Sequence, residues 1–233
     1  MGLRKRLERI WEAPDLSEFL KRHGKRAPLK IKKGQTIFYE GDQPDRLFFI
    51  IKGFIKLYHL SEEGKDSVIY LYGPGSILGI RALTSEDKSL KHNSEALTDV
   101  EIITIPRREF IDIASDNPEY LIDIMHSFIQ RLNYAERKLE GFITNDATTR
   151  LANFLSDAAI RFGQKKKEGI TIPIPLTHQQ IAEFVGSARE TVTIALHKLA
   201  KEGIVKISRG KVDILNKRKL DKYSNLPIKY IEK

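Results

Sequence analysis

The segment from Leu176 to Leu199, LTHQQIAEFVGSARETVTIALHKL, places two helix-start signals and one glycine within 24 residues. Thr177 with Gln180, and Ser187 with Glu190, both fit the capping box, in which a hydroxyl accepts from the N3 amide and the N3 side chain reaches back. Gly186 lies between them and supplies the positive φ that a sharp turn between helices requires. The spacing therefore predicts two short helices joined by a tight turn, a helix-turn-helix.

The second of these helices carries an apolar stripe and an opposite polar face. Val192, Ala195, Leu196 and Leu199 repeat at i, i+3, i+4 and i+7 and are expected to pack inward. If the helix enters a DNA major groove, Arg189 can donate to guanine and Glu190 can accept from cytosine N4. Predicted DNA contacts are Thr177, Gln179, Ser187, Arg189, Glu190, Thr191, Thr193, Ile194, Lys198 and Arg209, the hydroxyl and amide residues suiting phosphates. An ordinary corner between two helices is the alternative.

Charge favours the DNA interpretation. Residues 147–233 hold 17 basic and 8 acidic residues, whereas residues 1–146 hold 23 of each, so the whole net charge of +9 lies in the last third. A basic excess on the segment that carries a helix-turn-helix is typical of a protein that binds a phosphate backbone.

The sequence contains no cysteine, which excludes disulfides, thiolate iron–sulfur ligation and a catalytic thiol. It shows no secretory signal, and no aliphatic or aromatic run is longer than that of Leu47–Ile51, which is far too short to span a membrane. The expected location is the cytoplasm, without membrane association. The six histidines form no metal-binding pattern, and no nucleotide-binding or hydrolase motif is present, so neither an enzyme nor a metal site is predicted.

Residues 28–106 favour an antiparallel β-roll. Short β-rich runs are separated by glycines at roughly ten-residue spacing. Such a roll encloses a pocket more readily than it carries out catalysis. The runs are Thr36–Tyr39, Leu47–Ile51, Phe54–Tyr58 and Val68–Tyr72.

A long helix is predicted from just after Pro118 to Phe142. Its apolar residues step by 4 and 3 in alternation, which is a heptad seam and calls for a partner helix, although burial against the roll of the same chain is the alternative. A homodimer would place two recognition helices about 34 Å apart on a palindromic DNA site. The predicted dimer interface is Leu121, Met125, Phe128, Leu132, Ala135, Leu139 and Phe142.

This order of elements resembles the bacterial CRP/FNR regulators over residues 28–220. The likeness is carried by Lys33–Ile37 with Glu40–Asp42, by Leu47–Tyr58, by Gly73–Gly75 to Gly79, and most specifically by Gly186–Val192. It implies an α+β fold with an N-terminal helix and β-roll effector domain (1–116), a dimerisation helix and hinge (117–145, the hinge near 144–146) and a winged helix-turn-helix domain (146–233). It also implies a homodimeric transcription factor that contacts RNA polymerase, with a wing formed by Ile204–Ile207 and Lys211–Ile214.

The resemblance fails where cyclic AMP would bind. Family members that bind it carry a ribose-binding Glu, a phosphate-binding Arg-Ser pair and a hydroxyl pair on the dimer helix. Here those positions are Ile80, Leu90–Lys91 and Ala135–Glu136, which would leave the polar nucleotide unpaired. The effector is therefore expected not to be cyclic AMP, although Arg81 or Lys91 could bind another anion. The predicted pocket is Gly79, Ile80, Arg81, Lys91 and His92.

Three effector hypotheses stay open: a metabolite, no ligand at all, or haem held by His92, His59 or His126. A second departure concerns the operator. Many relatives carry an Arg four residues after the recognition-helix Glu, where this chain has Ile194. An apolar side chain there cannot donate to guanine but can pack on a thymine methyl, so we expect an altered half-site beside a retained G·C pair.

Overall fold

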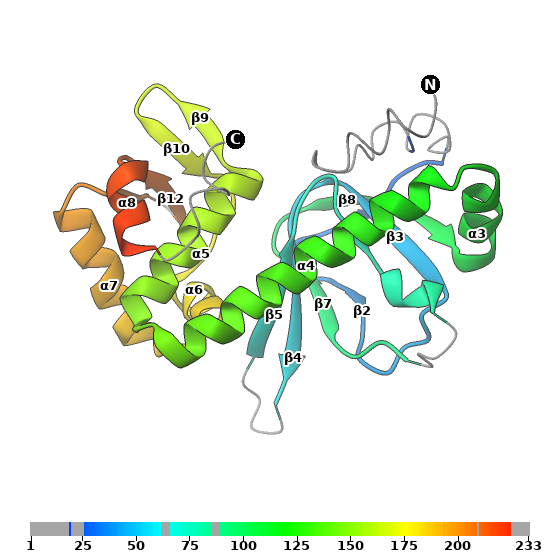
Figure 1. The fold of residues 1–233 in the computed structure, drawn as a ribbon, viewed down its shortest axis with the longest axis horizontal. Helices are drawn as coiled ribbons and strands as arrows, with labels where there is room; N and C mark the ends of the chain where they lie inside the picture. Colours follow the sequence, from blue (N-terminus) through cyan, green and yellow to red (C-terminus); the bar gives the residue numbers. More distant parts are fainter. Residues whose placement is uncertain (1–18, 20–25, 62–65, 85–88, 209, 225–233) are drawn as a thin grey trace. The chain divides into compact units, whose positions relative to one another are not determined.

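The computed structural model describes residues 19, 26–61, 66–84, 89–208 and 210–224. These residues form two compact units, residues 1–135 and 136–233, with one long helix, α4 (Glu119–Thr144), continuing from the first into the second (Figure 1). The predicted α+β class is confirmed, with a β-rich unit followed by a mainly helical unit that contains a small sheet.

The first unit is built on two antiparallel four-stranded sheets. One sheet has the order β1 (Leu29–Ile31), β8 (Val100–Pro106), β3 (Arg46–Lys52), β6 (Ile77–Leu78). The other has the order β2 (Thr36–Phe38), β7 (Asn93–Ala96), β4 (Ile55–Leu60), β5 (Asp66–Tyr72). All four β-rich runs of the sequence are strands, so the β-roll prediction is confirmed.

Strand β3 is apolar on both faces, which explains its continuous run of large side chains. Phe48 and Ile50 pack with strands of both sheets, whereas Leu47 and Phe49 face a second cluster with Phe110. Phe110 lies on α3 (Arg107–Asp116), and the beginning of α4 contributes to the same cluster. Because side chains alternate along a strand, a strand covered on both faces carries no polar alternation.

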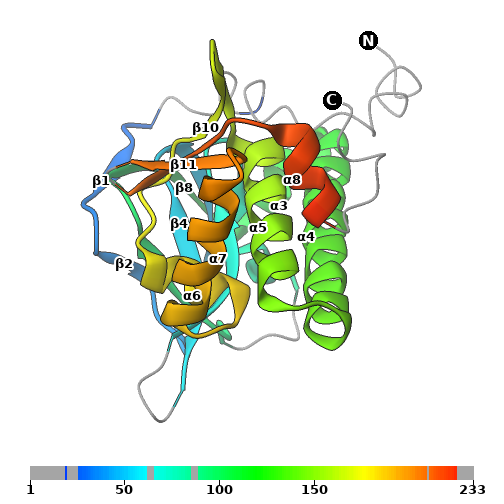
Figure 2. The same ribbon diagram turned by 90° about the vertical axis from the view of Figure 1, so that its left-hand side faces the viewer.

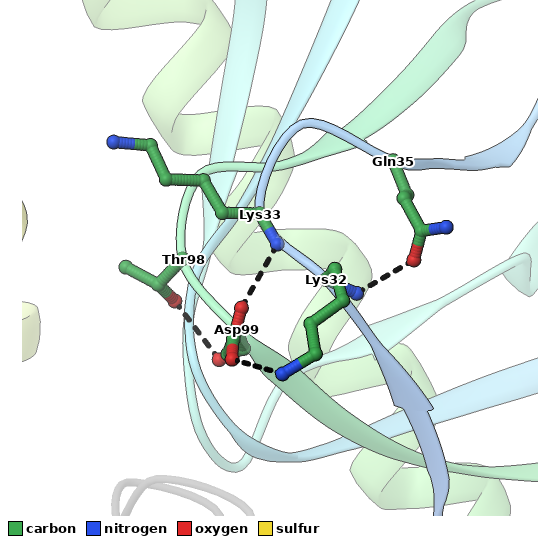
Figure 3. A network of polar contacts seen from close by, with 5 residues as sticks. All are labelled: Lys32, Lys33, Gln35, Thr98 and Asp99. Atoms are coloured by element: carbon green, nitrogen blue, oxygen red, sulfur yellow. Dashed lines mark hydrogen bonds and ion pairs between the residues drawn. The ribbon is translucent and has the colours of Figure 1, made fainter.

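The turn before β2 is fixed by one carboxylate. Asp99, in the β7–β8 turn, accepts hydrogen bonds from the backbone N–H of Lys33 (3.0 Å) and from the Lys32 ammonium (2.9 Å), as Figure 3 shows. Both donors favour the ionised form, with the Lys32 bond as the larger cause, and they hold the pKa of Asp99 below its usual value. These contacts keep the glycine-containing turn next to the sheet.

The second unit contains α5 (Ala147–Phe162), α6 (His178–Val185), α7 (Arg189–Lys201) and α8 (Lys217–Tyr223). Its sheet has the order β11 (Val205–Ser208), β12 (Lys211–Ile214), β10 (Gly169–Ile172), β9 (Gln164–Lys166). The predicted wing is therefore an antiparallel pair, β11 with β12, shifted by one residue at its first strand. Figure 2 shows α6 and α7 side by side, with α5 next to α7.

In the middle of the chain, the break between two long helices lies where the sequence predicted a hinge. Helix α4 begins directly after Pro118, as predicted, and ends at Thr144. Helix α5 begins at Ala147, after Asp146 caps it by accepting from the backbone N–H of Thr149 (2.7 Å). The break between the two helices falls at the predicted 144–146 segment. A short 3-10 helix, η1 (Ile80–Leu83), follows Gly79 in the first unit.

Candidate nucleic-acid interface and ligand pocket

The start of α6 carries the first predicted capping box. The Thr177 hydroxyl accepts from the Gln180 backbone N–H (3.1 Å), and the Gln180 side-chain oxygen accepts from the Thr177 backbone N–H (3.0 Å). Gly186 ends the helix in the left-handed region, with φ of 64°. Both features confirm the prediction for this half of the motif.

The second predicted capping box is wrong. Ala188 caps α7, and no side chain bonds to that cap. The reason lies in the preceding turn. After Gly186, the backbone N–H of Ser187 donates to the Ala182 carbonyl (3.1 Å), so Ser187 belongs to the C-terminal cap of α6 and not to the N-terminal cap of α7. Glu190 nevertheless lies in the first turn of α7, where a carboxylate favours the helix dipole.

Helix α7 separates its two faces as predicted. Val192, Ala195, Leu196 and Leu199 are buried. Of the predicted DNA contacts in this part of the chain, Arg189, Glu190, Thr191, Ile194 and Lys198 are exposed, Ile194 to 70%. On α6 and its cap, Thr177 and Gln179 are also exposed, whereas Ser187 is half-buried. Arg209 lies outside the described residues.

Thr193 is held by a residue that the sequence analysis missed. Its hydroxyl donates to the Arg189 carbonyl (2.8 Å) and lies 3.0 Å from His178 Nδ1. Because a hydroxyl has one proton, the His178 Nδ1–H must be the donor in the second bond. Thr193 therefore ties α7 to the first residue of α6. The only sequence signal was the place of His178 beside a helix cap.

Two further exposed residues of the motif have partners within the unit. Gln179 donates to Glu183 on the next turn of α6 (3.1 Å). The Lys198 ammonium lies 5.2 Å from the ring centre of Tyr223, whose hydroxyl donates to Glu202 (2.8 Å). These contacts orient long side chains that would otherwise sample many rotamers.

A hollow in the first unit gathers all five predicted effector residues: Gly79, Ile80, Arg81, Lys91 and His92. Its floor is apolar, formed by Phe38, Leu57, Tyr72, Leu78 and Leu90. Arg131 of α4 joins the lining and was missed, because α4 is distant in sequence and nothing local marks Arg131. The hollow is open to solvent on one side, and its interior has room for about one water molecule.

Basic groups dominate the polar lining of this hollow. The pKa of His92 is lowered, first by burial and then by the positive charges of Arg131 and Arg81, against a smaller opposite effect of Glu40. No carboxylate is among the described residues that line the hollow, and the Ile80 side chain is buried at the position where nucleotide-binding relatives are expected to carry Glu. The lining thus suits an anionic group and offers no carboxylate to accept from a ribose hydroxyl.

The described residues give little support to the haem hypothesis. Of the three candidate histidines, only His92 is among the described residues that line the hollow. His59 lies 3.2 Å from Glu40, and His126 lies 2.6 Å from the Gln130 side chain. Among the residues that the structure describes, no three acidic or histidine side chains are grouped so that they could hold a metal ion.

The predicted seam of α4 is largely open to solvent. Leu121, Met125, Phe128, Leu132, Leu139 and Phe142 are all exposed, Leu132 to 57% and Leu139 to 63%. The described residues of the β-roll therefore do not bury this stripe. Ala135 is exposed as well.

Comparison with known proteins finds a family match for each of the two units of the chain. Residues 28–117 match the cyclic nucleotide-binding domain model, and residues 149–223 match the Crp-like helix-turn-helix domain model. Together these define a protein with an effector-type β domain and a DNA-binding domain. In the described residues, no helix has the length and apolar character needed to cross a membrane.

Individual relatives define the family. The global nitrogen regulator of Nostoc sp. strain PCC 7120 is 31% identical over 79% of this chain and 83% of its own length. The CRP-like cAMP-activated global transcriptional regulator of Mycobacterium tuberculosis is 28% identical over 83% of this chain and 86% of its own length. A solved CRP/FNR-family regulator of Thermus thermophilus is 29% identical, with a TM-score of 0.68, and the match covers 84% of this chain and 97% of that one. The chain belongs to the CRP/FNR family of transcriptional regulators.

Proposed function

We propose that this regulator binds a palindromic operator as a homodimer, and that a small organic anion in the β-roll, not cyclic AMP, controls its affinity for that operator. The observation that carries the DNA part is the exposed face of α7, on which Arg189 and Glu190 lie at the N-terminal end that reaches base edges in such motifs. As a regulator of bacterial transcription it would act in the cytoplasm, in contact with RNA polymerase.

The dimer part is supported by α4. Its heptad positions are apolar and exposed over most of the helix, and a second copy would cover them with the same stripe. A two-fold axis along such a seam would make the DNA site palindromic. Residues 117–145 are accordingly proposed as the dimerisation helix and hinge, between an effector domain of residues 1–116 and a DNA-binding domain of residues 146–233.

The effector part is supported by the chemistry of the hollow. Arg81, Lys91 and Arg131 supply positive charge around apolar lining residues, and burial together with the Arg131 and Arg81 charges lowers the pKa of His92. Guanidinium groups bind carboxylate and phosphate in a bidentate geometry. A small carboxylate or phosphate ester with an apolar body matches this combination of charge and apolar surface, and the lining side chains would have to move apart to admit it, because the hollow has room for about one water molecule.

The test begins with the purified full chain and its visible spectrum, since a Soret band would instead favour haem. Random oligonucleotides bound by the protein define the operator, and affinity is then measured with panels of small carboxylates and phosphate esters. An operator that is not palindromic would overturn the dimer proposal. Tight binding that no added anion changes would favour a regulator that needs no effector.

Variants test the hollow itself. Arg131→Met should weaken the response to the active anion, because the variant removes a charge from the lining without altering the DNA-binding unit. Arg108→Met, an exposed arginine on α3, is the matched control and should respond as the parent does. Equal responses in both variants would show that the anion binds elsewhere. Cyclic AMP should leave operator affinity unchanged.

A further inference from the structure

Arg150, in the first turn of α5, holds three backbone carbonyls at once. Its Nε donates to the Val185 carbonyl (3.0 Å), one terminal nitrogen donates to the Asn145 carbonyl (2.8 Å), and the other donates to the Gly186 carbonyl (3.2 Å). These oxygens lie at the C-terminal ends of α4 and α6, where carbonyls have no partner within their own helix. The negative end of each helix dipole further favours a cation there.

Phe142, in the last turn of α4, completes the same cluster. The Arg150 guanidinium carbon lies 5.4 Å from its ring centre. A Cβ added to Gly186 would lie 2.3 Å from Cε1 and 2.7 Å from Cζ of this ring, so the turn before α7 approaches the aromatic edge more closely than any side chain would allow. The heptad pattern assigned Phe142 to the dimer seam, but its ring also packs within its own chain.

We infer that Arg150 and Phe142 are positioning residues for DNA recognition, which fix the start of α7 against the last turn of α4. Arg189 and Glu190 follow Gly186 within four residues, so a shift of this turn moves the side chains that would contact bases. Neither residue needs to touch DNA. The inference does not depend on the effector or on the operator being palindromic.

The first experiment replaces Arg150 by Lys and by Met in the full chain and measures operator affinity across a series of salt concentrations. Lys keeps the charge but cannot reach three carbonyls in one plane. Loss of hydrogen bonds made by a charged group should weaken operator binding by about tenfold in both variants. Arg161→Lys, on the same helix but paired with Asp157, is the matched control and should bind as the parent does.

The salt dependence separates positioning from direct contact with DNA. A residue that neutralises a phosphate contributes about 0.9 to the slope of log affinity against log salt, so its removal lowers that slope. We expect Arg150→Met to weaken binding with the slope unchanged. Unchanged affinity in both variants, or a slope lowered by about 0.9 in Arg150→Met, would overturn the inference.

A double-mutant cycle decides the matter if an Arg150 variant fails to fold. Gly186→Ala should weaken operator binding in the parent, because the new methyl group meets the Phe142 ring. In a Phe142→Ala background the same change should cost clearly less, since only the cost of a positive φ remains. Any effect of Phe142→Ala on dimerisation is present in both proteins of the second comparison and cancels from their difference. Additive losses would show that the ring does not position the turn.

Discussion

Ile194 exposes a large apolar side chain on the polar face of α7. Isoleucine offers no hydrogen-bond donor to guanine, whereas it can contact a thymine methyl group. We expect Ile194→Arg to change the preferred base pair at one position of each half-site toward G·C, while the pair facing Arg189 and Glu190 is retained. Selection of bound oligonucleotides by the parent and the variant measures this change.

Ile160→Arg is the matched control, since Ile160 is an exposed isoleucine on α5 of the same unit. It adds the same charge away from α7, so it should raise affinity for all sequences alike without changing the preferred site. If the Ile194→Arg variant selects the same site as the parent, Ile194 does not contact bases.

His92 should report the charge of the ligand hollow. Burial and the two neighbouring guanidinium groups lower its pKa, so the folded state holds fewer protons than the unfolded state just below pH 6.5. Its contribution to stability is therefore largest above pH 6.5 and is lost as the pH falls. We expect Arg131→Met to raise the pKa of His92 in an NMR titration of the histidine ring protons.

Arg137→Met serves as the control for that titration, because Arg137 lies on α4 near Asp157 and does not line the hollow. An active anion should also raise the pKa of His92, since it offsets the positive charges around the ring. A pKa of His92 that is the same in the parent and in Arg131→Met would contradict the electrostatic description of the hollow.

Among the helices, α5 depends on its N-cap. The hydrogen bond from the Thr149 backbone N–H lowers the pKa of Asp146 in the folded state. The stability that the ionised cap contributes is therefore present above pH 3.8 and is lost as the pH falls through the lower pKa of the folded state. Asp146→Ala should destabilise the helical unit by about 1 kcal/mol in urea unfolding at neutral pH. Asp146→Asn, which keeps a capping oxygen, should cost less.

The difference between the parent and Asp146→Asn should shrink as the pH falls from 3.8 through the lower folded-state pKa of Asp146, because both proteins then present an uncharged cap. Thr148→Ala tests a neighbouring position in the same turn that does not cap the helix, and it should leave stability nearly unchanged. An equal loss in Asp146→Ala and Thr148→Ala would show that the cap contributes nothing.

Structural features that depend only on residues close together in the sequence could be predicted from the sequence. The β-rich runs, the start of α4 after Pro118 and the Thr177 cap all rest on local pattern, and the structure confirms them. Ser187 shows where local pattern fails. Its sequence fits a cap as well as Thr177 does, but the Gly186 turn uses its N–H to close the previous helix.

Arg131 and Arg150 could not be assigned from the sequence, because their roles depend on contacts that only the fold brings together. Arg131 lines the hollow with residues that lie 39 to 93 positions earlier in the chain, and Arg150 bonds to carbonyls 35 and 36 residues later. An arginine in an amphipathic helix otherwise looks like an ordinary solvated residue. The five predicted pocket residues, which all line one hollow, were chosen because the family resemblance aligned them.

For the whole molecule, we propose that the exposed apolar seam of α4 determines the oligomeric state. A lysine in place of Leu132 would bury a charge at the centre of the proposed dimer, which is strongly unfavourable without a partner. We expect Leu132→Lys to sediment as a monomer at concentrations where the parent is a dimer, and to bind the operator weakly. Sedimentation velocity measures the first effect and a gel-shift titration the second.

Ile111→Lys is the matched control, because Ile111 is an exposed isoleucine on α3 outside the seam. It should remain dimeric and bind the operator as the parent does. A dimeric Leu132→Lys variant would show that another surface joins the two copies.

Arg131, which lines the ligand hollow, directly precedes Leu132 of the seam on α4. A ligand that orders Arg131 in one rotamer and a second chain that covers Leu132 then act on adjacent residues of one rigid helix. Thermodynamic reciprocity requires that, if ligand binding strengthens self-association by a given factor, self-association strengthens ligand binding by the same factor. If the ligand favours the proposed dimer, the half-saturating ligand concentration should fall as the protein concentration rises, and the abundance of the regulator would then be a second input to its sensitivity.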